Sequence, residues 1–189
     1  MKMINIFIVV YCLISPCLGF WLSSKTVDPK VDISTECINK ALTGDCGFFT
    51  CFEERLPCGE YGYAESYGGK YCWQFQQSHH LFTKKGVEFV EKLTRCHMNR
   101  SITSYRQNQI ECFSHYDQSF VIMGDCYVES GFCDVVIDNF MSLARILEPK
   151  DFTNYRVVRE VFRAAKQCPN NISGGIISKF LSYKRGSSL

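Results

Sequence analysis

The sequence predicts an all-α, disulfide-rich helical domain built from antiparallel helical hairpins. Two observations favour this fold class. Apolar residues recur at helical spacing along most of the chain, and a capping residue, a glycine or a proline bounds most of these runs. Cysteine is unusually frequent, with 12 in 189 residues. No segment keeps the strict alternation of apolar and polar residues that is typical of a strand.

The first 19 residues have the pattern of a signal peptide. Lys2 supplies a positive charge, residues 3–13 form an apolar run, and the small residue Gly19 stands at the expected cleavage point. Pro16 interrupts the run before it reaches the roughly 20 apolar residues that a membrane span needs. We therefore expect a secreted, extracellular protein without a membrane span, whose disulfides form in an oxidising compartment.

Charge and composition limit the remaining possibilities. The chain has 21 basic and 19 acidic residues without a long run of either sign, which argues against a nucleic-acid partner. A hydrophobic content of 46% is enough for one packed domain and excludes a disordered chain. Without an internal repeat or an early linker, we expect a leader over 20–33, one helical domain over 34–168 and a tail over 169–189.

The first half of the domain should contain several short helices. A cap at Ser34 or Thr35 begins a helix that Gly44 ends. The next helix ends at Pro57, and the glycine- and tyrosine-rich residues 59–70 read as a loop. Apolar positions mark these two helices: Cys37, Ile38, Ala41 and Leu42 in the first, and Phe48, Cys51, Phe52 and Leu56 in the second.

A helix is expected to resume near Tyr71, and Thr83 is the expected cap of the one after it. That helix carries Val87, Val90, Leu93 and Cys96 on one face. Two further helices are predicted over residues 101–115 and 117–130.

The last part of the domain reads as a helical hairpin. One amphipathic helix runs from Cys133 to a stop at Pro149, and a second begins at Asn154 and reaches Cys168. Both cysteines lie 14 residues from the turn, so in an antiparallel hairpin both sulfurs sit about 21 Å from it. We therefore pair Cys133 with Cys168. Beyond them, residues 169–175 read as a mobile link, and a short last helix carries Ile176, Ile177, Phe180 and Leu181.

Ten cysteines follow the predicted signal peptide: Cys37, Cys46, Cys51, Cys58, Cys72, Cys96, Cys112, Cys126, Cys133 and Cys168. None forms the C-x-x-C pair of a zinc or redox site, and the number is even, so five disulfides are expected. Cys37 and Cys51 lie on facing stripes of neighbouring helices, which leaves a local bridge open. His97 and His115 lie close to cysteines, but we interpret them as ordinary polar residues rather than zinc ligands.

Motifs for catalysis or cofactor binding are missing from the sequence. The Cys-Cys-x-x-His-Asp pattern of secreted phospholipases does not occur, and neither does Gly-x-Ser-x-Gly. The adjacent His79 and His80 point about 100 degrees apart on a helix and are read as exposed. Asp125, Glu129 and Asp134 lack the alternating oxygen ligands of a calcium loop. We therefore expect no enzyme activity, no cofactor and no metal.

Two N-glycosylation sequons are present, at Asn99 and Asn171. Both are expected between helices, where a glycan projects into water. In a secreted chain, both are candidate acceptors.

The order of the cysteines resembles that of the stanniocalcin family of secreted helical glycoprotein hormones. Successive intervals are 9, 5, 7, 14, 24, 16, 14, 7 and 35, and only the interval between Cys58 and Cys72 is clearly expanded. Three segments strengthen the resemblance: Cys37-Ile38-Asn39-Lys40-Ala41-Leu42, Gly47-Phe48-Phe49-Thr50-Cys51-Phe52-Glu53 and Lys85-Gly86-Val87-Glu88-Phe89-Val90. The sequon that the family often carries before the fourth framework cysteine is absent.

The resemblance implies a full pairing: Cys37–Cys51, Cys46–Cys72, Cys58–Cys112, Cys96–Cys126 and Cys133–Cys168. It also implies a non-catalytic role in calcium and phosphate homeostasis, or as an inhibitor that binds a secreted metalloprotease. The partner would be an extracellular receptor or that protease. Since no cysteine follows Cys168, a covalent dimer is not expected, whereas a noncovalent homodimer stays open. The alternatives are a disulfide-rich hydrolase, such as a phospholipase-like enzyme, and an unrelated disulfide-rich binding module.

Overall fold

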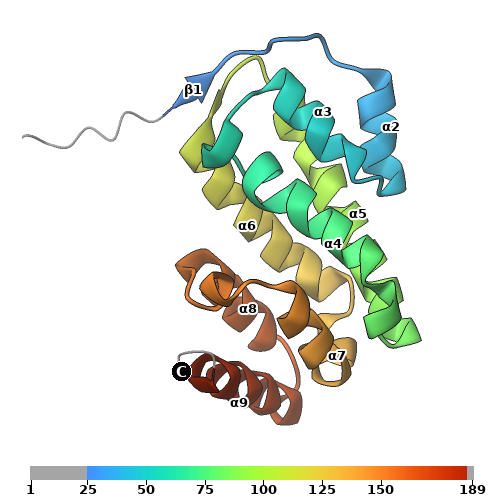
Figure 1. Cartoon of the computed structure of the whole chain (residues 1–189), viewed down its shortest axis with the longest axis vertical. Coiled ribbons are helices and arrows are strands. Elements are labelled where there is room, and N and C mark those ends of the chain that lie inside the picture. Colours follow the sequence, from blue (N-terminus) through green and yellow to red (C-terminus); the bar gives the residue numbers. More distant parts are fainter. Residues whose placement is uncertain (1–24, 187–189) are drawn as a thin grey trace, which may run out of the picture.

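The computed structural model describes residues 25–186 and confirms the all-α, disulfide-rich fold class. Two long helices run through the molecule, with shorter helices grouped at either end (Figure 1). The long helices are α5 (Lys84–Tyr105) and α6 (Cys112–Glu129). At one end lie α2 (Thr35–Thr43) and α3 (Gly47–Arg55), and at the other α7 (Phe132–Ile146), α8 (Tyr155–Ala165) and α9 (Asn170–Gly186), with α4 (Lys70–Gln77) between the two ends.

Side-chain caps begin three of the helices as the sequence predicts. The Ser34 hydroxyl accepts from the backbone N–H of Cys37 at the start of α2, and Gly44 ends that helix with φ +85°. Thr83 caps α5, and Asn154 caps α8 by the same kind of bond. Because a side-chain oxygen replaces the missing helical partner of an N–H group, each cap fixes where its helix begins.

The predicted helix over residues 101–115 is wrong. Helix α5 continues to Tyr105, the chain turns through exposed polar residues, and α6 starts only at Cys112. Before it, β2 (Ile110–Glu111) pairs antiparallel with β1 (Thr26–Val27), with Val27 opposite Ile110. Glu111 then caps α6, since its carboxylate accepts from the backbone N–H groups of Phe113 and Ser114. No glycine or proline marks this break.

Residues 59–70 are helical rather than a loop. A 3₁₀ turn, η1 (Gly59–Tyr61), is followed by the π-helical segment η2 (Ala64–Gly69), which runs directly into α4. Tyr63, Tyr67 and Tyr71 recur every fourth residue, so their rings share one face and pack inward. Gly68 permits the close approach, because a Cβ there would lie 2.4 Å from the Phe49 ring.

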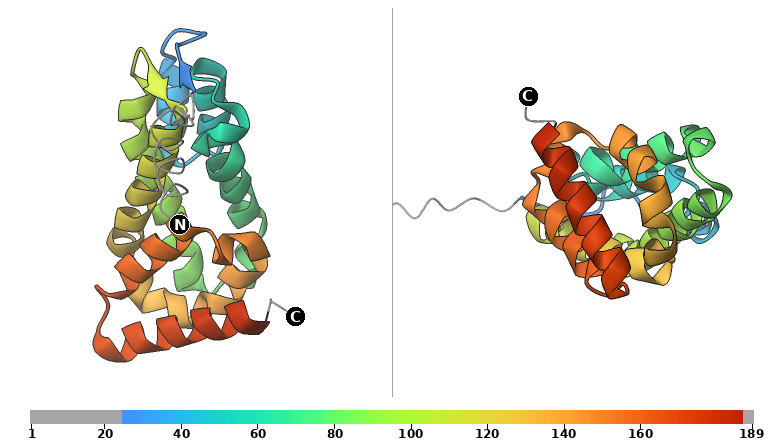
Figure 2. Two further views of the ribbon diagram at one scale, coloured as in Figure 1. Left: turned by 90° about the vertical axis from the view of Figure 1, so that its left-hand side faces the viewer. Right: turned by 90° about the horizontal axis from the view of Figure 1, so that it is seen from below.

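The tail is helical from Asn170 onward, so the predicted link over residues 169–175 is also wrong. Helix α9 crosses the far end of the molecule against α7 and α8 (Figure 2). Ile176 and Phe180 are buried there, and the Phe180 ring packs on Phe152 of the 3₁₀ turn η4 (Pro149–Phe152). The apolar stripe predicted for the tail is therefore covered in large part by the chain's own helices.

Buried side chains form three neighbouring clusters. The largest lies around α3 and is rich in aromatic rings, the second lies between α5, α6 and α7, and the third lies under α9. Their central members are Phe48, Phe52 and Tyr105 in the first, Phe89, Leu93 and Phe132 in the second, and Phe140, Phe152 and Phe180 in the third. Within residues 25–186, no helix has both the length and the apolarity to cross a membrane.

Candidate functional site

The ten cysteines that the sequence predicts to be paired form five disulfide bridges. Their Cα–Cα distances run from 5.4 to 5.9 Å, which is the ordinary range for a bridge. The bridged pairs are Cys37–Cys51, Cys46–Cys72, Cys58–Cys112, Cys96–Cys126 and Cys133–Cys168. These are the same pairs that the family resemblance implies.

The bridges divide unevenly along the chain. Three of them lie within residues 25–112 and tie α2 to α3, the start of α3 to α4, and the start of η1 to α6. One joins α5 to α6, and one joins α7 to the end of α8. Helix α9 contains no cysteine, so noncovalent packing holds it.

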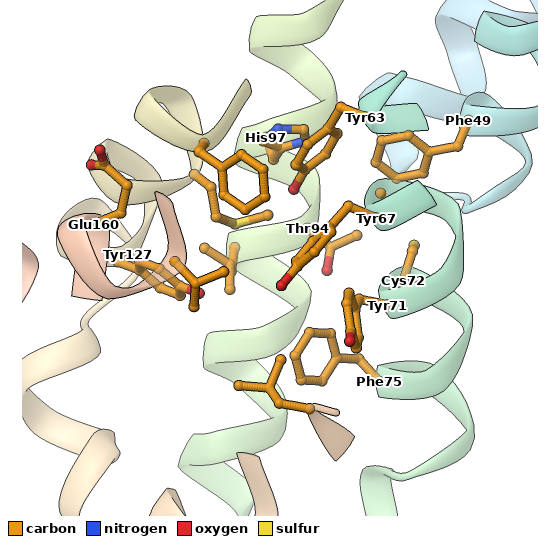
Figure 3. Close-up of a pocket in the computed structure, with 16 residues that line it drawn as sticks. Phe49, Tyr63, Tyr67, Tyr71, Cys72, Phe75, Thr94, His97, Tyr127 and Glu160 are labelled. Atoms are coloured by element: carbon orange, nitrogen blue, oxygen red, sulfur yellow. The ribbon is translucent and has the colours of Figure 1, made fainter. Parts of the chain in front are cut away.

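An apolar cavity of about 50 Å³ lies inside this framework, between α4, α5 and α6 (Figure 3). Aromatic rings from several elements line it, among them Tyr63, Tyr67, Tyr71, Phe75 and Phe120. The rings of Tyr67 and Phe120 pack edge to face with their centroids 4.8 Å apart. Such pairs contribute stability beyond the area that they bury. The cavity is therefore part of a packed aromatic core.

A buried carboxylate holds two of these tyrosines. The Tyr67 hydroxyl donates to Oδ1 of Asp151 at 2.5 Å, and the Tyr71 hydroxyl donates to Oδ2. The backbone N–H of Glu148 donates to the same Oδ2 at 2.9 Å. Burial raises the pKa of both phenols, and their hydrogen bonds to Asp151 raise it further. Both tyrosines therefore stay protonated as donors, and they connect η2 and α4 to η4.

His97 and His115 are core residues, which corrects their interpretation as ordinary polar side chains. The His97 ring packs 4.8 Å from the Tyr63 ring, and Nε2 donates to the carbonyl of Ser119 at 3.2 Å. The His115 ring stacks 4.8 Å from Phe52. Burial lowers the pKa of His97 to about 3 and that of His115 to about 4. Both imidazoles are therefore neutral at physiological pH.

The acidic residues considered for calcium do not form one group. Asp125 pairs with Arg163 at 2.6 Å, and both Asp125 and Glu129 pair with Arg100. Asp134 lies apart, exposed in the first turn of α7. Among residues 25–186, no three His, Cys, Asp or Glu side chains are placed to hold a metal ion together. His80 is exposed, as predicted, whereas His79 is partly buried.

The Asp125–Arg163 pair belongs to a longer series along the α6–α8 contact, which Arg100 of α5 extends at the Glu129 end. Arg159 and Arg163 each bind the carboxylate of Glu160 at 2.6 Å, and Arg156 binds Asp117 at 2.8 Å. Glu160 is only 2% exposed, so its charge needs both arginines. We call the series from Asp117 to Glu129 on α6, with its arginine partners, the ion-pair ladder.

Both sequon asparagines are exposed. Asn99 lies within α5 rather than between helices, because α5 continues to Tyr105, and Asn171 lies in the first turn of α9. Ser101 of the first sequon is buried, and its hydroxyl donates to the His97 carbonyl at 2.9 Å. A transferase that must contact Ser101 therefore has to act before α5 is packed.

Sequence reasoning missed Asp151 and the buried Arg55. Arg55 donates from Nε to the carbonyl of Tyr105 at 2.9 Å, and its other nitrogens donate to Val31 and Gln107 carbonyls. The signal available for Asp151 was the Glu-Pro-Lys-Asp run, which forms a capping box with proline in the first turn. Nothing local in the sequence distinguishes Arg55 from an exposed arginine.

Comparison with known proteins agrees with this architecture. The Stanniocalcin family model matches residues 24–187, which is nearly the whole chain. No solved structure matches the chain. The match begins before β1 and ends beyond α9, so it spans all five bridges. The chain therefore belongs to the stanniocalcin family.

Proposed function

We propose that the chain is a secreted, non-catalytic glycoprotein that acts as a hormone-like regulator by binding an extracellular protein. The observation that carries this proposal is the family match over residues 24–187, since stanniocalcins are non-enzymatic hormones. The five bridges support it, because such a framework persists outside the cell and not in the reducing cytosol. The signal peptide proposed over residues 1–19 lies outside the described residues.

The chemistry of the described interior also supports a binding role. His97 and His115 are buried and neutral, and Asp151 is engaged by two phenols and a backbone N–H. Side chains held in this way stabilise the fold and do not face a substrate. Recognition then falls to the exposed surface, which the bridges hold in a fixed shape. A preorganised surface loses little conformational entropy on binding.

Two finer roles follow from the family: control of calcium and phosphate transport, and inhibition of a secreted metalloprotease that releases growth factors from their binding proteins. The decisive experiment titrates the purified, oxidised chain against such a protease and measures cleavage of the binding protein. Inhibition that is lost after reduction and alkylation supports the inhibitor role. Calcium and phosphate uptake by epithelial cells, measured with the same two preparations, tests the transport role.

Secretion and glycosylation are tested together in a secretory cell line. N-terminal sequencing of the protein in the medium should give a start at or near Phe20, and thiol labelling should find no free cysteine. Removal of N-glycans should increase gel mobility, and Asn99→Gln and Asn171→Gln should each remove part of that change. A chain that stays in the cell with free thiols would contradict the proposal.

A further inference from the structure

We propose that Tyr61 is an acceptor site for tyrosine O-sulfation. The inference rests on the proposed secretion, because this modification is made in the secretory pathway. Tyr61 is 64% exposed, whereas Tyr63, two residues later, is only 2% exposed. In the described residues, no hydrogen bond engages the Tyr61 hydroxyl, while those of Tyr67 and Tyr71 are bound to Asp151. Tyr61 is thus the accessible tyrosine of the η1–η2 segment.

Acidic side chains surround this position. Glu60 precedes Tyr61 directly and is exposed, and Glu65 is exposed four residues later. Glu53 reaches the same turn, since its carboxylate accepts from the backbone N–H of Gly59. A sulfating enzyme with a basic groove would be attracted to such a segment by charge complementarity.

One cation lies beside the ring. The Lys25 ammonium is 6.0 Å from the centroid of Tyr61 and donates to the carbonyl of Cys58 at 2.8 Å. It does not cancel the three carboxylates, so the surroundings stay net acidic. After sulfation, the same ammonium stands beside the new anion. A local ion pair of this kind would favour the modified state modestly.

The backbone around Tyr61 can open at low cost. Helix η1 has only three residues, and the backbone bond from Gly62 N–H to the Gly59 carbonyl, 2.8 Å long, closes it. Gly59 has φ +63°, and glycines stand on both sides of the Glu60–Tyr61 pair. Local opening of so short a turn leaves the bridged core intact. The turn can therefore open locally between the bridged Cys58 and the buried Tyr63 and present the Tyr61 side chain to an enzyme cleft.

The reaction needs a sulfate donor of the adenylyl sulfate class. The Tyr61 phenolic oxygen attacks the sulfur and forms a new O–S bond. The S–O bond to the donor phosphate breaks, the phosphate leaves with the electron pair, and the phenolic proton passes to a base of the enzyme. Nothing is oxidised or reduced. The product carries one added SO₃ group and a permanent negative charge at the surface.

The test expresses the full chain in a secretory cell line supplied with radioactive sulfate. N-glycans are removed from the protein in the medium before counting, because glycans can also carry sulfate. Wild type should retain label, with an intact mass increased by one SO₃ group that phosphatase does not remove. Tyr61→Phe should lose the label, and Glu60→Gln should reduce it several-fold.

Tyr155→Phe is the matched control. Tyr155 is 71% exposed, but its neighbours are Asn154 and Arg156, and the Arg159 guanidinium lies 5.6 Å from its ring centroid. This variant should keep the wild-type label. Secreted, deglycosylated wild type without label would overturn the inference and leave secretion standing, and label that survives in Tyr61→Phe would overturn it as well. Unlabelled chain that never reaches the medium would contradict both proposals.

Discussion

Residues 25–112 contain three complete disulfide bridges, whereas residues 132–186 contain one. We call these the bridged region and the C-terminal region, with α6 lying between them. The bridged region packs large rings such as Phe48, Phe52 and Tyr105. The C-terminal region packs rings of its own, Phe140, Phe152 and Phe180, together with small residues such as Ala164, and its helix α8 joins α6 through the ion-pair ladder. One fold class is thus stabilised by two different means within one chain.

The difference indicates where the chain depends on a single covalent link. In the bridged region, losing one bridge leaves the others and an aromatic core in place. In the C-terminal region, losing Cys133–Cys168 leaves α8 and α9 held by noncovalent contacts alone. These are packing, the ion pairs between α8 and α6, and the hydrogen bond from the Tyr183 hydroxyl to the Ala144 carbonyl at 3.2 Å. We therefore expect loss of this bridge to reduce the amide protection of α8 and α9 strongly, while the rest of the chain keeps its protection.

The largest expected effect tests that difference directly. Replacing Cys133 and Cys168 together by alanine opens a sequence separation of 35 residues and should destabilise the chain by about 4 kcal/mol. Replacing Cys37 and Cys51, with a separation of 14, should cost about 3 kcal/mol. Urea unfolding measures both losses of stability, and amide hydrogen exchange shows which helices lose protection. Loss of protection confined to α8 and α9 is expected only when Cys133 and Cys168 are replaced. The same exchange pattern in both double variants would contradict the proposed difference between the two regions.

The second effect uses pH to weaken the aromatic core. Burial holds the folded-state pKa of His97 at about 3 and that of His115 at about 4, below the ordinary value of 6.5. Their stability contribution is therefore fully present above pH 6.5, falls as the pH drops below that value, and is completely lost once the pH has fallen through the folded values. Between about pH 6.5 and about pH 5.5, the two together should cost about 2 kcal/mol. Denaturant unfolding at each pH measures this slope.

His115→Gln should roughly halve that pH dependence, because one of the two buried imidazoles is then absent. The exposed His80 supplies the control, and His80→Gln should leave the slope as in wild type. A His115→Gln variant with the full wild-type slope would show that the buried histidines do not cause the acid sensitivity.

The third effect concerns the contact between the two regions. Asp151→Asn keeps one acceptor oxygen but places an amide NH₂ opposite one phenol, so a buried hydroxyl loses its acceptor. We expect a loss of about 1 to 2 kcal/mol by urea unfolding. A double-mutant cycle with Tyr67→Phe should show coupling between the two positions. Additive losses would contradict the shared hydrogen bond, and Asp138→Asn, at an exposed position on α7, is the control.

The smallest expected effect concerns the contribution of the exposed end of the ion-pair ladder to the stability of the fold. Arg100 pairs with Asp125 and Glu129, and its side chain is 38% exposed. Arg100→Ala should therefore cost only about 0.2 to 1 kcal/mol, and less in high salt. Arg106→Ala, at an exposed position just after α5, serves as the control. A loss as large as that of a bridge would mean that this exposed ion pair stabilises the α5–α6 contact as strongly as a covalent link.

Prolines, glycines and helix-capping residues decided how much of the fold could be predicted from the sequence. The hairpin from Cys133 to Cys168 was predictable because Pro149, Asn154 and Pro169 mark its limits. The turn after Tyr105 was not, because its residues are polar but contain neither glycine nor proline. In residues 59–70, the four glycines suggested a loop, and the spacing of the tyrosines outweighed them in the folded chain.

The candidate site shows the same limit. The disulfide framework could be predicted from the cysteine spacing, because each cysteine must find a partner. The family resemblance supplied the pairs that helix geometry left open. The roles of Asp151 and His97 depend on neighbours about 80 and 20 residues away, Tyr71 and Ser119. Tertiary packing creates those environments, and no local pattern marks them.

The buried Arg55 has a consequence for the order of folding. Arg55 is 4% exposed, and its guanidinium donates to the carbonyls of Val31, Tyr105 and Gln107, which come from two distant parts of the chain. Removing this cation from water is unfavourable until its acceptors are in place. We therefore expect the segment before α2 and the turn after α5 to dock in one cooperative step, after α3 and α5 have met, so that the earliest described residues of the chain are among the last to reach their native positions.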